Sequence, residues 1–293
     1  MVARGEIELA TLARQSFFRN GAKIGRTKLL LSACGDKESG SPVHGSDPDT
    51  TAPALTGLEF PSNGQTKADI RFKFTGSGLQ PMYPATYIWR VKLRRQAGYY
   101  TTFFWGPDGE FTGNGYYGCH PYPDGEPKDA SRAHKWELSI SGNDIVDDAN
   151  GHSTQLGYDA WRIQALRVWD NGSNKVHEYF WDLPDTTKVI RVLEPRSYGP
   201  NGSPPALTFG DAPWNLQSER LSGILRGIQT YSAKLDVADI LFELERPAGT
   251  NAGTAAIWYL NLNPTPEDIS DKSGKGHHPA WVGSDRATRW QGP

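Results

Sequence analysis

Residues 221–241 constrain the fold of this chain more than any other stretch, because a strand pattern runs directly into a short helical pattern. After Gly223, residues of one set alternate with those of another: Ile224, Arg226, Ile228 and Thr230 against Leu225, Gly227, Gln229 and Tyr231. This period of two, rich in β-branched residues, predicts a central strand in a sheet whose two faces differ. We expect the strand to stop at Ser232 and a short helix to follow at 236–241.

The order of these elements resembles a signature of concanavalin-A-like and laminin-G-like jelly-roll domains: a strand, then Tyr231-Ser232, Lys234-Leu235, Asp236 and Ala238-Asp239-Ile240. The resemblance implies an all-β fold, an antiparallel jelly-roll β-sandwich. It also implies that Leu235 and Ile240 plug the end of the sandwich. It indicates function poorly, because this fold carries lectins, hydrolases, lyases and structural modules alike.

A second stretch, residues 271–278, resembles the Asp-x-Ser-Gly-x-Gly-x-His turn of laminin-G-like modules. The resemblance implies that Gly274 and Gly276 supply positive φ angles and that Asp271 caps the loop. The turn lies after the main signature. It could therefore belong to the same sandwich or begin a truncated second one.

Further strands are expected along the chain, separated by residues that favour turns. The 293 residues could hold one large sandwich or two small domains, and 10 Trp, 12 Tyr and 11 Phe suffice for one all-β core. A hairpin turn is predicted at 170–174. The expected strands are 68–74, 86–94, 99–105, 135–140, 161–169, 175–182 and 207–209. We divide the chain into an N-terminal arm and linker (1–52), the sandwich (53–246) and a C-terminal extension (247–293).

The N-terminal arm is locally basic on an acidic protein. Its six cations, against Glu6 and Glu8, are Arg4, Arg14, Arg19, Lys23, Arg26 and Lys28. A weak helical stripe closes at Asn20-Gly21. Either residues 1–31 are a frayed tail, or they dock on a neighbouring subunit with Phe17 and Phe18 as anchors.

Composition excludes several classes of partner. A net charge of −2 and a pI near 6.4 argue against a nucleic-acid binder. No apolar run reaches ~18 residues, so no transmembrane helix is expected. Cys34 and Cys119 form no metal motif and are expected to be a free pair. Asp147-Asp148 and Asp170-Asn171 could bind calcium, although acidic turns are commonly only turns.

Aromatic residues indicate a binding surface. The run 99–105 has aromatic residues at both odd and even positions, so a strand there would carry rings on both of its faces. The stretch 106–127, expected to be a loop, adds more aromatic residues. Flat rings suit the apolar faces of sugars, and Asn and Asp side chains suit their hydroxyls. The rings could equally cover the open end of the sandwich or meet another subunit. The predicted ligand-binding residues are Trp105, Asn114, Tyr116, Tyr117, His120 and Tyr122.

Catalytic patterns are weaker. Hydrolases of the jelly-roll family that this chain resembles use a Glu-x-Asp-x-x-Glu strand. The nearest stretch, 177–182, offers Glu178 and Asp182 without a third acid, so we expect a solvated strand face there. Polysaccharide lyases of the same family use an arginine, an asparagine or glutamine, a histidine and a tyrosine. The candidates are Arg90, Gln164, His177 and Tyr179, without the family's local motifs.

The sequence therefore favours non-catalytic recognition of a glycan or surface, with no cofactor, as part of an extracellular or virion assembly. A polysaccharide lyase or glycoside hydrolase is the alternative. Residues 30–35 resemble a lipoprotein cleavage box, but the apolar run before them is too short for a signal peptide. This favours a chain made in the cytoplasm and released by lysis, as phage structural proteins are; a misassigned gene start is the competing explanation.

Overall fold

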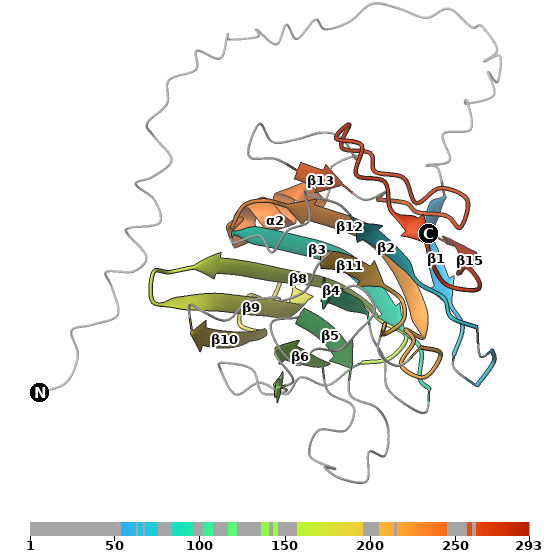
Figure 1. Ribbon diagram of the computed structural model, residues 1–293, viewed down its shortest axis with the longest axis horizontal. Coiled ribbons are helices and arrows are strands. Elements are labelled where there is room, and N and C mark those ends of the chain that lie inside the picture. The colour runs from blue at the N-terminus through green and yellow to red at the C-terminus, as the bar shows by residue number, and fades with distance from the viewer. Residues whose placement is uncertain are drawn as a thin grey trace, which may run out of the picture. The chain divides into compact units, whose positions relative to one another are not determined.

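The computed structural model shows two facing antiparallel sheets and, among the residues that it describes, one helix at 237–244 (Figure 1). It describes residues 54–62, 64–66, 68–75, 84–96, 102–107, 117–121, 136–140, 143–145, 157–195, 205–213, 216–244, 257–259 and 262–292. The N-terminal arm and linker lie outside this part of the chain. The predicted fold class, an antiparallel jelly-roll β-sandwich, is confirmed.

The larger sheet has the order β10-β9-β8-β3-β12-β1-β15, and β13 pairs with the second half of β12. Its strands are β1 (Leu55–Phe60), β3 (Ala85–Leu93), β8 (Trp161–Asp170), β9 (Asn174–Leu183), β10 (Val189–Pro195), β12 (Gly223–Tyr231), β13 (Ile257–Tyr259) and β15 (Thr288–Gly292). The smaller sheet has the order β14-β2-β11-β4-β5-β6-β7. Its strands are β2 (Phe72–Thr75), β4 (Phe103–Pro107), β5 (Tyr117–Pro121), β6 (Trp136–Ile140), β7 (Asn143–Ile145), β11 (Pro205–Phe209) and β14 (Ala280–Trp281).

The core fills the space between the two sheets. Aromatic and aliphatic side chains from both sheets meet there and are almost completely buried, among them Trp89, Tyr179, Phe72 and Phe209. The Trp89 and Tyr179 rings stack with centroids 6.2 Å apart. Each such side chain contributes about 1.5–3 kcal/mol by leaving water. We call the face of the larger sheet that is turned away from this core its outer face.

Strand β12 is central, as predicted, but its alternation is broken by a bulge. The register against β3 shifts between Arg226 and Gln229. At the shift Gly227 has a φ of +63°, a left-handed conformation that glycine adopts without strain. The bulge reverses which residues face inward, so Leu225 and Ile228 both lie in the core. Arg226 and Gln229, opposite Arg90 and Ile88, lie on the outer face.

Helix α2 (Val237–Leu244) covers one end of this outer face. Ile240 is fully buried and Leu235 nearly so, as expected from the sequence. However, they pack on outer-face residues of the larger sheet, such as Ile88 and Phe180, rather than plugging the end of the sandwich. The Gln229 amide donates to the Glu243 carbonyl over 3.1 Å, which ties the helix to β12. Within the described ranges, no helix is long and apolar enough to span a membrane.

The C-terminal segment contributes strands to both sheets. β15 pairs with β1 along five residues, and β14 pairs with β2. In the turn before β14, Gly274 and Gly276 both have a φ of +77°, and the Asp271 carboxylate accepts from Ser273 N at 2.8 Å and His277 N at 3.0 Å. The loop-capping role implied by the resemblance is confirmed. The segment therefore belongs to the sandwich described here, which answers the question that the sequence leaves open.

The stretch 106–127 is expected to be a loop, and this is wrong for residues 106–107, which end β4, and for residues 117–121. Residues 117–121 form β5, which pairs with β4 on one side and β6 on the other. The five residues contain a glycine and a proline and no β-branched side chain, so local propensity does not favour a strand. The two neighbouring strands satisfy its backbone groups and make it one. In contrast, the predicted hairpin turn at 170–174 is confirmed, with Gly172 at a φ of +94°.

Arg220 is a fully buried cation that fixes the connection between β1 and β2. Its guanidinium donates to the carbonyls of Pro61 at 2.9 Å, Ser62 at 2.9 Å, Thr66 at 3.2 Å and Ala68 at 2.5 Å. Peptide carbonyls thus replace the water that a guanidinium loses on burial. Asp211 lies close enough to interact with this charge, and its own burial raises its pKa to about 7.

This raised pKa predicts a pH dependence of folding. The folded state holds the Asp211 proton more tightly than the unfolded chain, in which the pKa is near the usual 3.8. The contribution of this group to stability is therefore complete below about pH 4 and is lost as the pH rises towards about 7. Chemical unfolding should give free energies of unfolding for the unmodified chain and for Asp211→Asn. The difference between the two should change by up to about 1.4 kcal/mol per pH unit across this window. Parallel pH profiles would contradict the assignment.

Candidate functional site

The outer face of the larger sheet carries a cluster that α2 leaves uncovered. We call it the tryptophan–arginine patch: Trp161 on β8, Trp290 on β15, Arg226 on β12, Arg90 on β3, and Asn263 in the segment before β14. The Trp161 and Trp290 rings meet edge to face, with centroids 5.3 Å apart and planes at 70°. Trp161 is 36% exposed, and Trp290 is half-buried. Two indole rings from distant parts of the sequence therefore form one surface.

The position of Trp290 depends on a glycine. Trp290 pairs with Gly57 of β1 in the register of the sheet. A Cβ on Gly57 would lie 3.1 Å from the Ile224 side chain and 3.4 Å from the Trp290 ring. Because Gly57 has no side chain, the space above β1 is left for Trp290 to lie next to Ile224.

Arg226 lies below the Trp161 ring and is only 9% exposed. Its Cζ is 6.0 Å from the centroid of that ring, a cation–π contact. Its Nη2 donates to the Asn263 side-chain oxygen over 2.9 Å. Asn263 is brought to this position because the backbone NH of Gly227, at the bulge, donates to the Leu262 carbonyl over 2.9 Å.

Arg90 lies directly opposite Arg226 on the neighbouring strand. Its guanidinium donates to the carbonyl of Leu244 at the C-terminal end of α2, the negative end of the helix dipole. Burial first, and the nearby charge of Arg90 second, lower the pKa of Arg226 to about 10. Like charges placed directly opposite each other on adjacent strands are unfavourable.

The chemistry of the patch is that of a binding surface. The indoles offer flat apolar faces, and the guanidinium groups offer hydrogen-bond donors in a fixed plane. No group of three or more His, Cys, Asp or Glu side chains suited to a metal ion occurs among the described residues. Asp170 and Asn171 use side-chain oxygens to accept from backbone NH groups of their own turn. Asp147-Asp148 lies outside the described part of the chain.

The residues predicted to bind a ligand are distributed differently. Trp105 of β4 and Tyr117 of β5 are direct neighbours in the register of the smaller sheet, and His120 follows on β5. Asn114, Tyr116 and Tyr122 lie outside the described residues. This surface stays a prediction.

The four residues of the lyase alternative do not form one site. Arg90 is on the outer face, whereas Gln164, His177 and Tyr179 are buried on the inner face, each at most 1% exposed. The Gln164 amide is held inside the core, accepting from Trp89 Nε1 at 2.8 Å and donating to the Trp181 carbonyl at 3.3 Å. Burial lowers the pKa of His177 to about 3, with the charge of Lys175 as a smaller cause.

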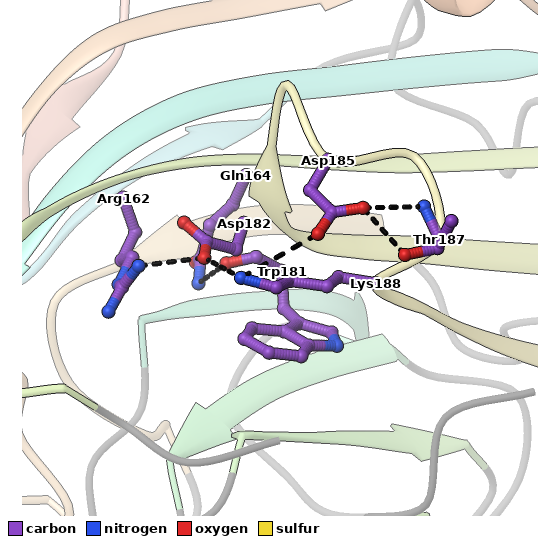
Figure 2. A network of polar contacts seen from close by, with 7 residues as sticks. All are labelled: Arg162, Gln164, Trp181, Asp182, Asp185, Thr187 and Lys188. Carbon is purple, nitrogen blue, oxygen red and sulfur yellow. Dashed lines mark hydrogen bonds and ion pairs between the residues drawn. The ribbon is translucent and has the colours of Figure 1, made fainter. Parts of the chain in front are cut away.

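The two acids of strand β9 are ion-paired, so the expected solvated face is wrong. Glu178 is 6% exposed and receives Arg167 at 2.5 Å and Arg191 at 2.8 Å. Figure 2 shows Arg162 and Lys188 on either side of the Asp182 carboxylate. Arg162 Nη1 and Lys188 Nζ lie 2.7 Å and 2.6 Å from Asp182 Oδ2. The pairing of β9 with β8 has a bulge between Ile163 and Ala165, so the register shifts between Glu178 and Asp182. The Asp182 network joins β8 to the β9–β10 turn.

Sequence reasoning missed the patch, although weak signals exist. In the stretch 288–292, Trp290 stands between arginine and glutamine with no other large apolar residue, which is unusual for a core strand. Trp161 begins a strand that was predicted, but its face could not be assigned. Only the pairing of β15 with β1 brings the two indoles together.

Comparison with known proteins adds information about the fold. No protein-family model matches the chain, and no curated protein does. A candidate carbohydrate-binding protein from Bacteroides ovatus is similar over 82% of this chain, with a TM-score of 0.53 and 11% identity. The similarity shows the fold. This chain spans 60% of the length of that protein.

Two further structures are similar at a lower level. The native heptameric SAP-like pentraxin of Limulus polyphemus covers 81% of this chain over 94% of its own, with a TM-score of 0.44 and 11% identity. The CBM40 module of the Ruminococcus gnavus IT-sialidase, bound to α2,6-sialyllactose, is similar over 65% of this chain and 98% of its own length, with a TM-score of 0.43 and 11% identity.

The Asp182 network predicts a structural effect without a functional one. Asp182→Asn removes the charge that two cations share, so the free energy of unfolding should fall by about 1–3 kcal/mol, measured by chemical unfolding. Ligand binding at the patch should be unchanged. Glu267→Gln, which removes an exposed partner of Arg289, is the matched control and should keep the free energy of unfolding of the unmodified chain. Equal free energies of unfolding for the two variants would contradict the structural role of Asp182.

Proposed function

We propose that this chain is a glycan-binding β-sandwich and that the tryptophan–arginine patch is its binding surface. The observation that carries the proposal is the pair of indole rings, side by side and solvent-accessible, on a sheet face next to hydrogen-bond donors. The apolar faces of a pyranose ring stack on such indoles, while guanidinium and amide groups bind its oxygen atoms. The description of the Bacteroides ovatus protein as a candidate carbohydrate-binding protein agrees with this proposal.

We propose recognition rather than turnover. Among the described residues, the acids nearest to a hydrolase pattern, Glu178 and Asp182, are each engaged by two cations. The histidine and tyrosine of the lyase alternative are buried in the core, where a polymer cannot reach them. Oligosaccharides that bind should therefore be recovered intact.

Binding should depend on the two indoles. Trp161→Ala and Trp290→Ala should each weaken glycan binding by about tenfold or more, because an exposed aromatic platform supplies much of the contact energy. Both indoles are partly exposed, so melting temperatures should change little. The measurement is a glycan-array screen followed by titration calorimetry on the glycans that bind.

Trp169→Ala is the matched control. Trp169 also lies on the outer face of β8, but Lys234 covers its ring at 4.0 Å. This variant should bind glycans as the unmodified chain does. If none of the array glycans binds, or if Trp161→Ala binds as well as the control, the patch is not the binding surface.

We propose further that the module acts within an extracellular or virion assembly, docked through the basic segment 1–31. Six cations against two acids in this segment suit an acidic partner surface. A chain without residues 1–31 should keep its glycan affinity, since the patch lies wholly in the sandwich, and should lose self-association or incorporation into particles. Light scattering measures the self-association. Identical masses per particle for the full and shortened chains would contradict the docking role.

A further inference from the structure

Arg226 combines two properties that are costly together: it is a cation, and it is 9% exposed. Moving a charge out of water is unfavourable unless an opposite charge or a full set of hydrogen bonds compensates for it. In the described part of the chain, Arg226 has one hydrogen bond, to the neutral amide oxygen of Asn263. Its Nε is buried without a hydrogen-bond partner.

The charges around Arg226 make its position less favourable rather than more. Arg90 faces it on β3, and Lys92 follows on the same face of that strand. The acid closest in register, Glu59, is held by Arg94 in an ion pair. Among the described residues, none forms an ion pair with Arg226. The patch is thus a local excess of positive charge on a chain whose net charge is −2.

Arg220 shows that this fold can satisfy a buried guanidinium when no ligand is involved. Its donors reach four peptide carbonyls within 3.2 Å. Arg226 lacks such a shell and instead lies beneath a partly exposed tryptophan. A buried cation that is compensated only by one neutral acceptor and one aromatic ring, at the edge of a surface, is typical of a site whose partner is a ligand.

We infer that the patch binds a sugar that carries a carboxylate, with Arg226 as the group that receives it. This inference rests on the proposed function, because it identifies the class of glycan that the same patch takes. A planar guanidinium donates two parallel hydrogen bonds to a carboxylate, a geometry that a hydroxyl cannot match. The neighbouring indoles supply the apolar contact for the sugar ring. A polyanion such as nucleic acid would instead require an extended basic surface, which the net charge does not favour.

Two classes of sugar supply this chemistry: sialic acids at the ends of glycans and uronic acids within polysaccharides. The experiment therefore uses both, as sialyllactose and as a glucuronate disaccharide, each beside its methyl ester. The ester keeps the ring and removes the charge. Titration calorimetry on the full chain should show at least one of the two acids binding about tenfold or more tightly than its ester.

Arg226→Gln should abolish this preference, so that acid and ester bind alike. Because the substitution removes a buried charge without a counter-ion, the unliganded variant should melt at the same or a higher temperature. Arg226→Lys, which keeps the charge and loses the fork, should retain a smaller preference and serves if the first variant does not fold. Arg191→Gln is the matched control: it removes an exposed arginine at the other end of the same face and should keep the full preference.

The outcomes separate the two proposals. Equal binding of acids and esters that still requires Trp161 would overturn the carboxylate assignment and leave glycan recognition in place. A preference for the acid that survives in Arg226→Gln would also overturn it. If neither acid, ester nor any neutral array glycan binds, the proposed function fails, and the inference fails with it.

Discussion

The bulge at Gly227 is the constraint on which both the fold and the site depend. By inserting one left-handed residue into the central strand, it places Leu225 and Ile228 in the same core while Arg226 remains on the outer face. The same residue uses its backbone NH to hold Leu262, and with it Asn263, next to Arg226. A strictly alternating β12 would leave the C-terminal segment without this anchor. One local distortion thus couples core packing to the construction of the patch.

Two buried arginines are compensated in different ways in this molecule. Arg220 is surrounded by carbonyl oxygens that the chain itself provides, and it organises the β1–β2 connection. Arg226 is nearly as buried, but it has a single neutral acceptor and a second arginine across the strand pair. The first arrangement satisfies the charge within the fold, whereas the second leaves donors for the anion that we propose. The same reasoning assigns the fully paired Asp182 network a structural role.

The sequence predicts the parts of this structure that local rules control. The central strand β12, the Asp170–Asn174 hairpin and the Asp271 turn each follow from residues close together in the chain, and each is found, whereas the bulge that interrupts the alternation of β12 was not predicted. Long-range pairing controls what was missed. β5 is a strand because β4 and β6 flank it, Glu178 is buried because Arg167 and Arg191 reach it, and Trp161 meets Trp290 because β15 adds to β1. No spacing in the sequence encodes these contacts.

A crystal structure of the full chain with a carboxylate-bearing sugar bound would test the proposed role of the tryptophan–arginine patch most directly. We expect the carboxylate of the sugar within hydrogen-bond distance of the Arg226 guanidinium and its ring against Trp161 or Trp290. A sugar bound instead along β4 and β5 of the smaller sheet, with the patch unchanged, would contradict it.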